Sequence, residues 1–440
     1  MFDVPSPVAV IDRLAFGGNG VCRLDGKVCF VPFSCPGDEV RLKITTQKKS
    51  YCTAEILELI SPSPSRTTPA CPIFGSCGGC NWQHINYQVQ LEQKRRIFAD
   101  TLWRGARVEG EFIKDVVAAP AQYGYRSRVQ LKVYASNGKL QIGFFRHGSH
   151  EVEDAAQGCP VAVPQINELL KCFRAVLPLF SEPEAIPQIS IDAGEHELVA
   201  VVHYIGQDIP KIRSFLNARS SELISCTGLL LQTGQKIIPE QLRGEGEIGY
   251  LMPNRDPDKK TSLLNYRPGG FAQVNQCQNL ALLSVIRRLG EFTGPENLLD
   301  LYCGNGNFTI PLAADVASVV GVEGFQNSID SAVLNSAANG LLNAEFLCLD
   351  VSAALRGFVK DGRIFDVVLL DPPRTGAGDA VPDIARLNPC RIIYVSCDPA
   401  TLARDCAQLA GYGYRVAESV PIDMFPQTYH LESVTLLVKS

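Results

Sequence analysis

The residues best suited to chemistry stand near the carboxyl end of the chain. There the segment Ser396-Cys397-Asp398-Pro399 follows the apolar run 391–395, R-I-I-Y-V. A β-branched run of this kind predicts a buried parallel strand. Ligands of open α/β sheets bind beyond the carboxyl ends of the strands, so we expect Cys397 to face a site. A thiolate in that position can act as a nucleophile.

A candidate proton acceptor follows some thirty residues later. The segment Y-H-L-E-S at 429–433 precedes a last apolar strand, expected at 434–438. Glu432 is the expected general base, with His430 as its rival. From the residues alone, either could also be an ordinary polar residue of the surface.

Residues suited to a nucleotide-like cofactor follow four successive expected strands between 297 and 371. The first strand leads into a glycine turn, which lets the backbone approach a ligand closely. Glu323 follows the second strand and can accept hydrogen bonds from ribose hydroxyls, Asp350 follows the third and suits an adenine amino group, and Asp371 follows the fourth. Each acid alone could cap the next helix. Together they predict a site for S-adenosylmethionine, with NAD as the alternative ligand.

A cysteine cluster precedes these strands. Cys71, Cys77 and Cys80 have the spacing C-x5-C-x2-C within a glycine-rich segment, and Cys159 is the best placed fourth ligand. Four cysteines hold either zinc or an iron–sulfur cluster. A triplet with one distant cysteine favours a [4Fe–4S] cluster by a narrow margin. Three unrelated buried cysteines remain the third interpretation.

Three parts of the chain are expected to position these residues. Residues 1–61 hold five short strands, which indicate an OB-like barrel of the kind that binds single-stranded nucleic acid. Residues 62–268 mix strands and helices in a central α+β iron–sulfur domain, with a hairpin at Asn137-Gly138 and a helix at about 87–110 expected to pack on the catalytic domain. Residues 269–440 alternate strands and helices, which predicts a Rossmann-like α/β methyltransferase domain.

The composition limits the class of protein. The 440 residues carry a net charge of −5, and neither a signal peptide nor an apolar run of membrane-spanning length is evident. We therefore expect a cytoplasmic protein without a membrane segment, in which the 16 cysteines are not disulfides. Residues 87–150 hold eleven Lys and Arg against five acids, which is either a solvated face or a surface for phosphates.

A thiolate beside a methyl donor suits one reaction in particular. Uracil C5 is a poor nucleophile, but addition of a thiolate to C6 makes C5 nucleophilic enough to take a sulfonium methyl group. A general base must then remove the C5 proton so that the thiolate can leave. A uridine buried in folded RNA has to be flipped out to reach such a site.

The motifs of the chain resemble those of the RNA uracil-C5 methyltransferase family, nearest to its bacterial 23S ribosomal RNA branch. Residues 271–275 resemble the motif F-x-Q-x-N, residues 300–308 resemble D-L-[FY]-C-G-x-G-x-F, and residues 396–401 resemble S-C-x-P-x-T. Residues 430–432 resemble H-x-E, and residues 1–61 resemble the TRAM RNA-binding barrel.

The resemblance implies a role for each candidate residue. Cys397 would be the nucleophile and Glu432 the base. Six residues would contact S-adenosylmethionine: Gln273, Tyr302, Asn307, Glu323, Asp350 and Asp371. Four cysteines would hold a [4Fe–4S] cluster: Cys71, Cys77, Cys80 and Cys159.

The expected function is methylation of uridine C5 in 23S ribosomal RNA by a monomer. A tRNA uridine is the alternative substrate. The barrel and the cysteine cluster together favour the ribosomal branch, but they do not exclude tRNA. An iron–sulfur redox protein with a nucleotide-binding domain is the alternative from another class.

Overall fold

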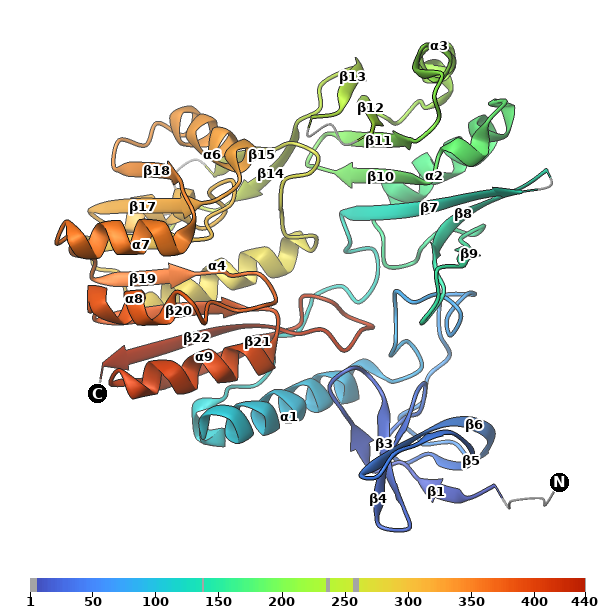
Figure 1. Ribbon diagram of the computed structural model, residues 1–440, viewed down its shortest axis with the longest axis horizontal. Coiled ribbons are helices and arrows are strands. Elements are labelled where there is room, and N and C mark those ends of the chain that lie inside the picture. Colours follow the sequence, from blue (N-terminus) through green and yellow to red (C-terminus); the bar gives the residue numbers. More distant parts are fainter. Residues whose placement is uncertain (1–5, 137, 235–237, 256–260, 440) are drawn as a thin grey trace.

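The computed structural model describes residues 6–136, 138–234, 238–255 and 261–439, and within them the chain forms four β-sheets (Figure 1). A small barrel holds the amino-terminal strands, a second sheet with two helices follows, and the third part is a larger layered α/β unit. Among the described residues, none of the helices combines the length and the apolarity that crossing a bilayer requires.

The amino-terminal barrel is a six-stranded sheet with the order β1-β5-β6-β4-β3-β2. Its strands are β1 (Val8–Val10), β2 (Arg13–Leu14), β3 (Gly20–Leu24), β4 (Lys27–Val31), β5 (Glu39–Gln47) and β6 (Tyr51–Ser61). The sequence predicts five of these strands, and the structure adds the two-residue β2. Side chains that alternate inward along β3 to β6 form the barrel core, which includes Cys22, Cys29, Val31, Val40 and Leu42.

Helix α1 (Tyr87–Ala106) joins the barrel to the rest of the molecule. Asn86 caps it by accepting a hydrogen bond from the Val89 amide (3.0 Å), and the helix ends at Ala106, four residues before the expected 110. Its apolar face packs on α9 (Pro399–Gly411), where a Cβ atom at Gly105 would lie 2.7 Å from that of Ala403. This close contact fixes α1 against the α/β unit (Figure 1).

The central sheet has seven strands in the order β13-β12-β11-β10-β7-β8-β9. The strands are β7 (Arg128–Ser136), β8 (Lys139–Phe145), β9 (Val152–Asp154), β10 (Gln188–Ala193), β11 (Leu198–Tyr204), β12 (Gly228–Thr233) and β13 (Glu240–Arg243). Helices α2 (Pro164–Val176) and α3 (Ile209–Arg219) contribute to the apolar core on one face of this sheet. Strands β7 and β8 form the expected hairpin, although Asn137 at its turn lies outside the described residues.

The α/β unit is built on a second seven-stranded sheet with the order β18-β17-β16-β19-β20-β22-β21. Its strands are β16 (Asn297–Leu301), β17 (Ser318–Glu323), β18 (Ala344–Cys348), β19 (Val367–Leu370), β20 (Arg391–Ser396), β21 (Tyr414–Ile422) and β22 (Glu432–Lys439). All neighbours are parallel except β22, which runs antiparallel to both β20 and β21. The expected mostly parallel sheet is therefore confirmed.

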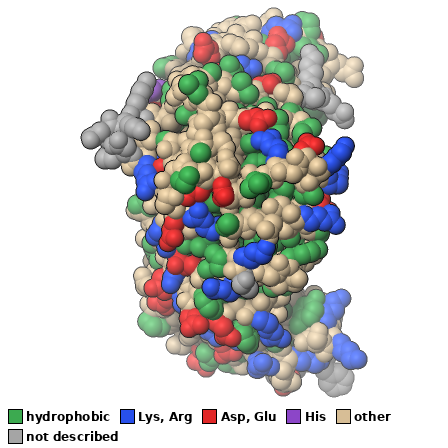
Figure 2. All heavy atoms as spheres, turned by 90° about the vertical axis from the view of Figure 1, so that its left-hand side faces the viewer, with side chains coloured by type: hydrophobic (Ala, Val, Ile, Leu, Met, Phe, Trp, Pro, Cys, Tyr) green, Lys and Arg blue, Asp and Glu red, His purple; other side chains and the backbone are tan. Residues whose placement is uncertain are grey.

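Helices cover both faces of this sheet, as its apolar strands require. They are α4 (Gln276–Gly290), α5 (Thr309–Leu312), α6 (Gln326–Ala338), α7 (Val351–Lys360), α8 (Val381–Leu387) and α9. The antiparallel ribbon of β14 (Ile248–Met252) and β15 (Ser262–Tyr266) packs its buried residues into the core beside α4. Acidic and basic side chains are interspersed among the described residues on the outer face of the unit (Figure 2).

Candidate active site

Strand pairing brings the expected nucleophile and the expected base together. Ser396 on β20 lies opposite Ser433 on β22, and the Ser433 hydroxyl donates a hydrogen bond to the Ser396 carbonyl (3.3 Å). Cys397 follows Ser396, and Glu432 precedes Ser433 on the antiparallel neighbour. The two side chains therefore stand at the same end of adjacent strands. The last strand begins two residues before the expected 434 and thus includes Glu432.

The turn that carries Cys397 is held in place by the residue after it. Asp398 caps α9 by accepting hydrogen bonds from the amides of Ala400 (2.8 Å) and Thr401 (3.1 Å). The Ser396 hydroxyl also donates to the Asp398 carbonyl (3.0 Å). The half-buried thiol is thus fixed between a strand end and a helix start.

The electrostatics of this pair depend on Asp371, which follows β19. Burial, and then Glu432 and Asp371, raise the pKa of Cys397 to about 12, against a smaller opposing effect of Arg374. Burial and then Asp371 hold the pKa of Glu432 well above its usual range. Burial raises the pKa of Asp371 itself to about 7. Without a ligand the site therefore concentrates acids that resist ionisation, and a cation placed among them would favour their charged forms.

Glu432 suits the role of base better than His430. Burial and then Arg374 lower the pKa of His430 to about 4, and its ring packs 4.2 Å from that of Tyr429. A proton acceptor works best when its pKa is near the working pH, which favours the raised carboxyl over the depressed imidazole. Glu432 is 5% exposed, and within the described residues its Oε2 atom has no hydrogen-bond partner.

The expected cofactor residues lie along the carboxyl edge of the parallel strands. Tyr302 follows β16 with a left-handed backbone (φ 63°), and burial and then Asp350 raise its pKa to about 12. Glu323 ends β17, and its charge also contributes to the raised pKa of Tyr302. The structure thus brings together Tyr302, Glu323, Asp350 and Asp371, each at the end of a neighbouring strand.

Two of these acids also make local hydrogen bonds. Glu323 accepts one from the Phe325 amide (2.8 Å). Asp350 is exposed and caps α7 by accepting one from the Ala353 amide (3.0 Å). The capping interpretation therefore holds for Asp350, whose second oxygen remains available to a ligand.

Asn307 lies in the glycine turn after β16, and Gln273 lies in the segment that precedes α4. Asn307 exchanges two hydrogen bonds with Asn279 on α4 (2.8 and 2.9 Å). Gln273 is half-buried in the segment before α4, which Asn275 ties to the Met424 carbonyl (3.0 Å). Sequence reasoning missed Asn279, because its partner lies 28 residues away and nothing local marks it.

Asp300, inside β16, is a further acid that the sequence reasoning did not assign to the site. Burial raises its pKa to about 7, with smaller contributions from Asp371 and Glu323. Its Oδ2 atom accepts a hydrogen bond from the Thr309 hydroxyl (2.5 Å), and Oδ1 has no partner within the described residues. A buried acid with an unpaired oxygen next to the cofactor edge fits a positively charged ligand such as a sulfonium.

The four cysteines of the expected cluster lie near enough to affect the ionisation of one another. Burial is the main cause that raises the pKa of Cys80 to about 12 and that of Cys77 to about 11, and Cys159 and Cys71 contribute to both shifts. Cys71 also raises the pKa of Cys159. The Gly79 amide donates to Cys77 Sγ (3.4 Å), a contact that a thiolate ligand would strengthen. Within the described residues no group of three or more ligands is already close enough to hold a metal ion.

Comparison with known proteins agrees with this geometry. A family model described as tRNA (Uracil-5-)-methyltransferase matches residues 256–440, and the TRAM domain of tRNA (uracil(54)-C(5))-methyltransferase matches residues 8–65. A 23S rRNA (uracil(1939)-C(5))-methyltransferase RlmD of Pseudomonas aeruginosa is 36% identical over 97% of this chain and 92% of its own length. The chain belongs to the RNA uracil-C5 methyltransferase family.

Members of this family depend on S-adenosylmethionine, so the expected cofactor is confirmed and NAD is set aside. An RNA methyltransferase of Thermosynechococcus vestitus is 34% identical over 98% of this chain and 97% of its own. The crystal structure of a Pyrococcus abyssi tRNA (uracil-54, C5)-methyltransferase, in complex with S-adenosyl-L-homocysteine, is similar over 98% of this chain and 99% of that one. That similarity has a TM-score of 0.74 at 27% identity.

Proposed function

We propose that this protein methylates C5 of a uridine in 23S ribosomal RNA, by covalent addition of Cys397 to the base. The observation that carries the proposal is the position of Cys397 beside Glu432 at one end of adjacent strands. Relatives described as 23S rRNA methyltransferases, similar over almost the whole chain, support the choice of RNA. Family membership removes the alternative of an iron–sulfur redox protein.

In the proposed reaction Cys397 and Glu432 act in turn. The Cys397 thiolate adds to C6 of the flipped uracil, and the electron pair displaced from the C5–C6 bond makes C5 nucleophilic. S-adenosylmethionine, when bound at the cofactor edge, supplies the methyl group that C5 takes. Glu432 then removes the C5 proton, the double bond re-forms, and the thiolate leaves.

The six proposed cofactor residues hold the methyl donor beside this pair. Glu323 and Asp350 keep an oxygen for the nucleoside part, and Asp371 lies between the cofactor edge and Glu432. A bound sulfonium would lower the pKa of the surrounding acids, since an opposite charge favours their ionised forms. Charge on the donor thus helps to prepare both the nucleophile and the base.

We further propose that Cys71, Cys77, Cys80 and Cys159 hold a [4Fe–4S] cluster. The mutual effect of their thiols on one another supports a shared site, and bound iron would supply the opposite charge that four buried thiolates require. The cluster belongs to a central domain of residues 62–268, between a barrel of residues 1–61 and a catalytic domain of residues 269–440. We expect the enzyme to work as a cytoplasmic monomer.

A tRNA uridine is the second candidate substrate, because the family models and the Pyrococcus abyssi enzyme are named for tRNA. Mass mapping of 5-methyluridine in both RNAs, from cells with and without the gene for this protein, separates the two. Loss of one methyl group from 23S ribosomal RNA alone is the expected result. Loss from tRNA alone would transfer the assignment to tRNA, and no loss from either would overturn the proposal.

A further inference from the structure

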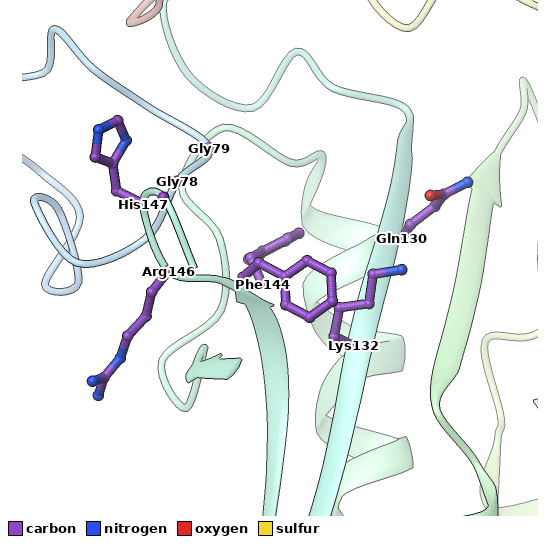
Figure 3. A pocket seen from close by; sticks show the side chains of 9 residues that line it. Gly78, Gly79, Gln130, Lys132, Phe144, Arg146 and His147 are labelled. Carbon is purple, nitrogen blue, oxygen red and sulfur yellow. The ribbon is translucent and has the colours of Figure 1, made fainter. Parts of the chain in front are cut away.

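One face of the central sheet carries two adjoining hollows. The first, of about 370 Å³, is lined by Gln130, Lys132, Phe145 and Arg146 among others (Figure 3). The second, of about 260 Å³, is lined by Lys132, Phe145, Gln188 and His203 among others. Because the hollows share Lys132 and Phe145, they form one groove, which we call the central groove.

The floor of the central groove is a row of polar side chains across four strands. Lys132 on β7 pairs with Gln188 on β10, which pairs with His203 on β11, which pairs with Gln232 on β12. Paired residues of a sheet point to the same face, so this row lies opposite the face that the apolar core covers. Helices thus pack on one side of the sheet, and amide and imidazole groups line the part of the other side that does not pack on β14 and β15.

Aromatic side chains border this row. Phe145 is 37% exposed, and Tyr134, two residues beyond Lys132 on β7, is 54% exposed. The Lys132 ammonium lies 5.2 Å from the centre of the Phe145 ring and donates to Gln188 Oε1. A nucleotide offers replacements for both contacts, since its phosphate can take the ammonium and its base can stack on the ring.

The charged side chains of the central groove favour a nucleotide base over a phosphate group alone as its ligand. Arg146 points away from Lys132 (Figure 3) and pairs with Glu151 (3.2 Å) and Glu153 (2.9 Å). Burial and then Lys132 lower the pKa of His203, which keeps its ring neutral at neutral pH. Lys132 therefore carries the positive charge of the groove, beside several neutral hydrogen-bonding groups suited to base edges.

The groove is connected both to the active site and to the cysteine cluster. The Ser127 amide, just before β7, donates to the Val274 carbonyl (2.8 Å), next to Gln273. Lys132 lies five residues further, about 16 Å along a strand. At the other end the Gly78 amide donates to the Phe145 carbonyl (2.9 Å), so the cluster loop forms the wall of the groove.

We propose that the central groove binds a single-stranded nucleotide of the substrate RNA, away from the flipped uridine itself, by stacking its base on Phe145 and pairing its phosphate with Lys132. This rests on the proposed function only in taking RNA as the substrate. The groove holds the strand that flanks the target and contributes affinity, and the chemical step does not involve it. Loss of groove contacts therefore raises KM and leaves kcat unchanged.

The test uses the full-length protein, an unmodified 23S ribosomal RNA transcript, and the variants Phe145→Ala and Lys132→Gln. We expect Kd and KM for the transcript to rise roughly tenfold or more for Phe145→Ala, the effect of losing one stacked base. Lys132→Gln should raise both and reduce the dependence of Kd on salt. Lys171→Gln on α2, on the other face of the sheet, and Tyr412→Ala at the end of α9 are the matched controls and should change neither.

The outcomes separate this inference from the proposed function. Unchanged Kd and KM in both groove variants, with the thermal unfolding temperature also unchanged, would overturn the groove assignment whatever RNA is methylated. Methylation of a tRNA transcript instead of the 23S transcript would overturn the substrate proposal, and the same variants compared on tRNA would still test the groove. A lower kcat at saturating RNA would also contradict the inference.

Discussion

Lys94 on α1 donates a 2.5 Å hydrogen bond to Asp423, and the side chains of both are fully buried. The Lys94 ammonium also donates to the Phe425 carbonyl (3.1 Å). Gln90, one turn earlier, exchanges hydrogen bonds with Gln427 (3.0 and 3.1 Å). Helix α1 thus holds the segment that leads into Glu432, although the two are more than 300 residues apart in the chain.

Lys94→Met should lower the free energy of unfolding by about 3–5 kcal/mol, because it leaves the Asp423 carboxylate buried without its partner. Urea denaturation followed by circular dichroism measures the change. The matched double variant Lys94→Met with Asp423→Leu removes both charges and should recover most of the loss. A double variant as unstable as the sum of its single changes would show that the pair is not coupled.

The sequence locates the residues at the strand ends, but it does not reveal the buried ion pair of Lys94 and Asp423. Acids after successive apolar strands had to meet at one edge of a parallel sheet, so Glu323, Asp350 and Asp371 could be located from spacing alone. Lys94 was counted in a basic stretch suited to a solvated face or to phosphates, which is wrong for this residue, since it is 1% exposed. No local pattern reveals a buried charge whose partner comes from the other end of the chain.

The site also shows which details depend on tertiary packing. Asp300 lies inside an apolar strand, and only the packing of its neighbours makes it a buried acid with a raised pKa. The amide pair of Asn279 and Asn307 likewise depends on how α4 meets the glycine turn. Motif spacing identified Cys397 and Glu432, but their adjacency required the antiparallel pairing of β22 with β20.

Glu432→Gln should make Cys397 more reactive toward iodoacetamide in the absence of RNA. Once ionised, Glu432 raises the pKa of the thiol, so a neutral amide in its place lowers that pKa and increases the thiolate fraction at alkaline pH. Mass spectrometry of the Cys397 peptide, between pH 7 and pH 11, gives the rate of alkylation. The exposed Glu345→Gln serves as control and should leave the profile unchanged. Slower alkylation of the Glu432 variant would contradict the arrangement described.

Asp300→Asn should flatten the dependence of stability on pH. Burial raises the pKa of Asp300 to about 7 in the folded protein, while an unfolded chain ionises it near pH 4. The folded state therefore binds the extra proton between these values, and stability falls as pH rises through that window, by on the order of 4 kcal/mol in total. The asparagine oxygen can still accept the hydrogen bond of the Thr309 hydroxyl. Because the asparagine side chain does not titrate, the variant does not lose this stability as the pH rises.

Urea denaturation of the wild-type protein and of Asp300→Asn at pH 5 and pH 8 tests this expectation. The variant should gain stability relative to wild type at pH 8 and little at pH 5. Asp361→Asn, at the exposed end of α7, is the control and should follow the wild-type curve. Parallel curves for wild type and Asp300→Asn would show that this carboxyl does not titrate in the window.

Protein purified without oxygen should contain iron and sulfide in equal amounts, about four of each per chain. Cys159→Ser should lose most of both, because it removes the distant ligand of the proposed cluster. The exposed Cys390→Ser is the matched control and should keep the iron and sulfide content of the wild type. Tightly bound zinc without iron or sulfide would contradict the proposed cluster and show that the four cysteines hold zinc.

The most direct test of the account is a covalent bond between Cys397 and the target base. A substrate transcript containing 5-fluorouridine keeps fluorine where Glu432 would otherwise remove a proton, so elimination cannot occur and the adduct persists. With S-adenosylmethionine present, the account predicts a denaturant-stable protein–RNA complex joined through the Cys397 peptide, and none with Cys397→Ala. Continued methylation of the ordinary transcript, with no adduct on the fluorinated one, would contradict it.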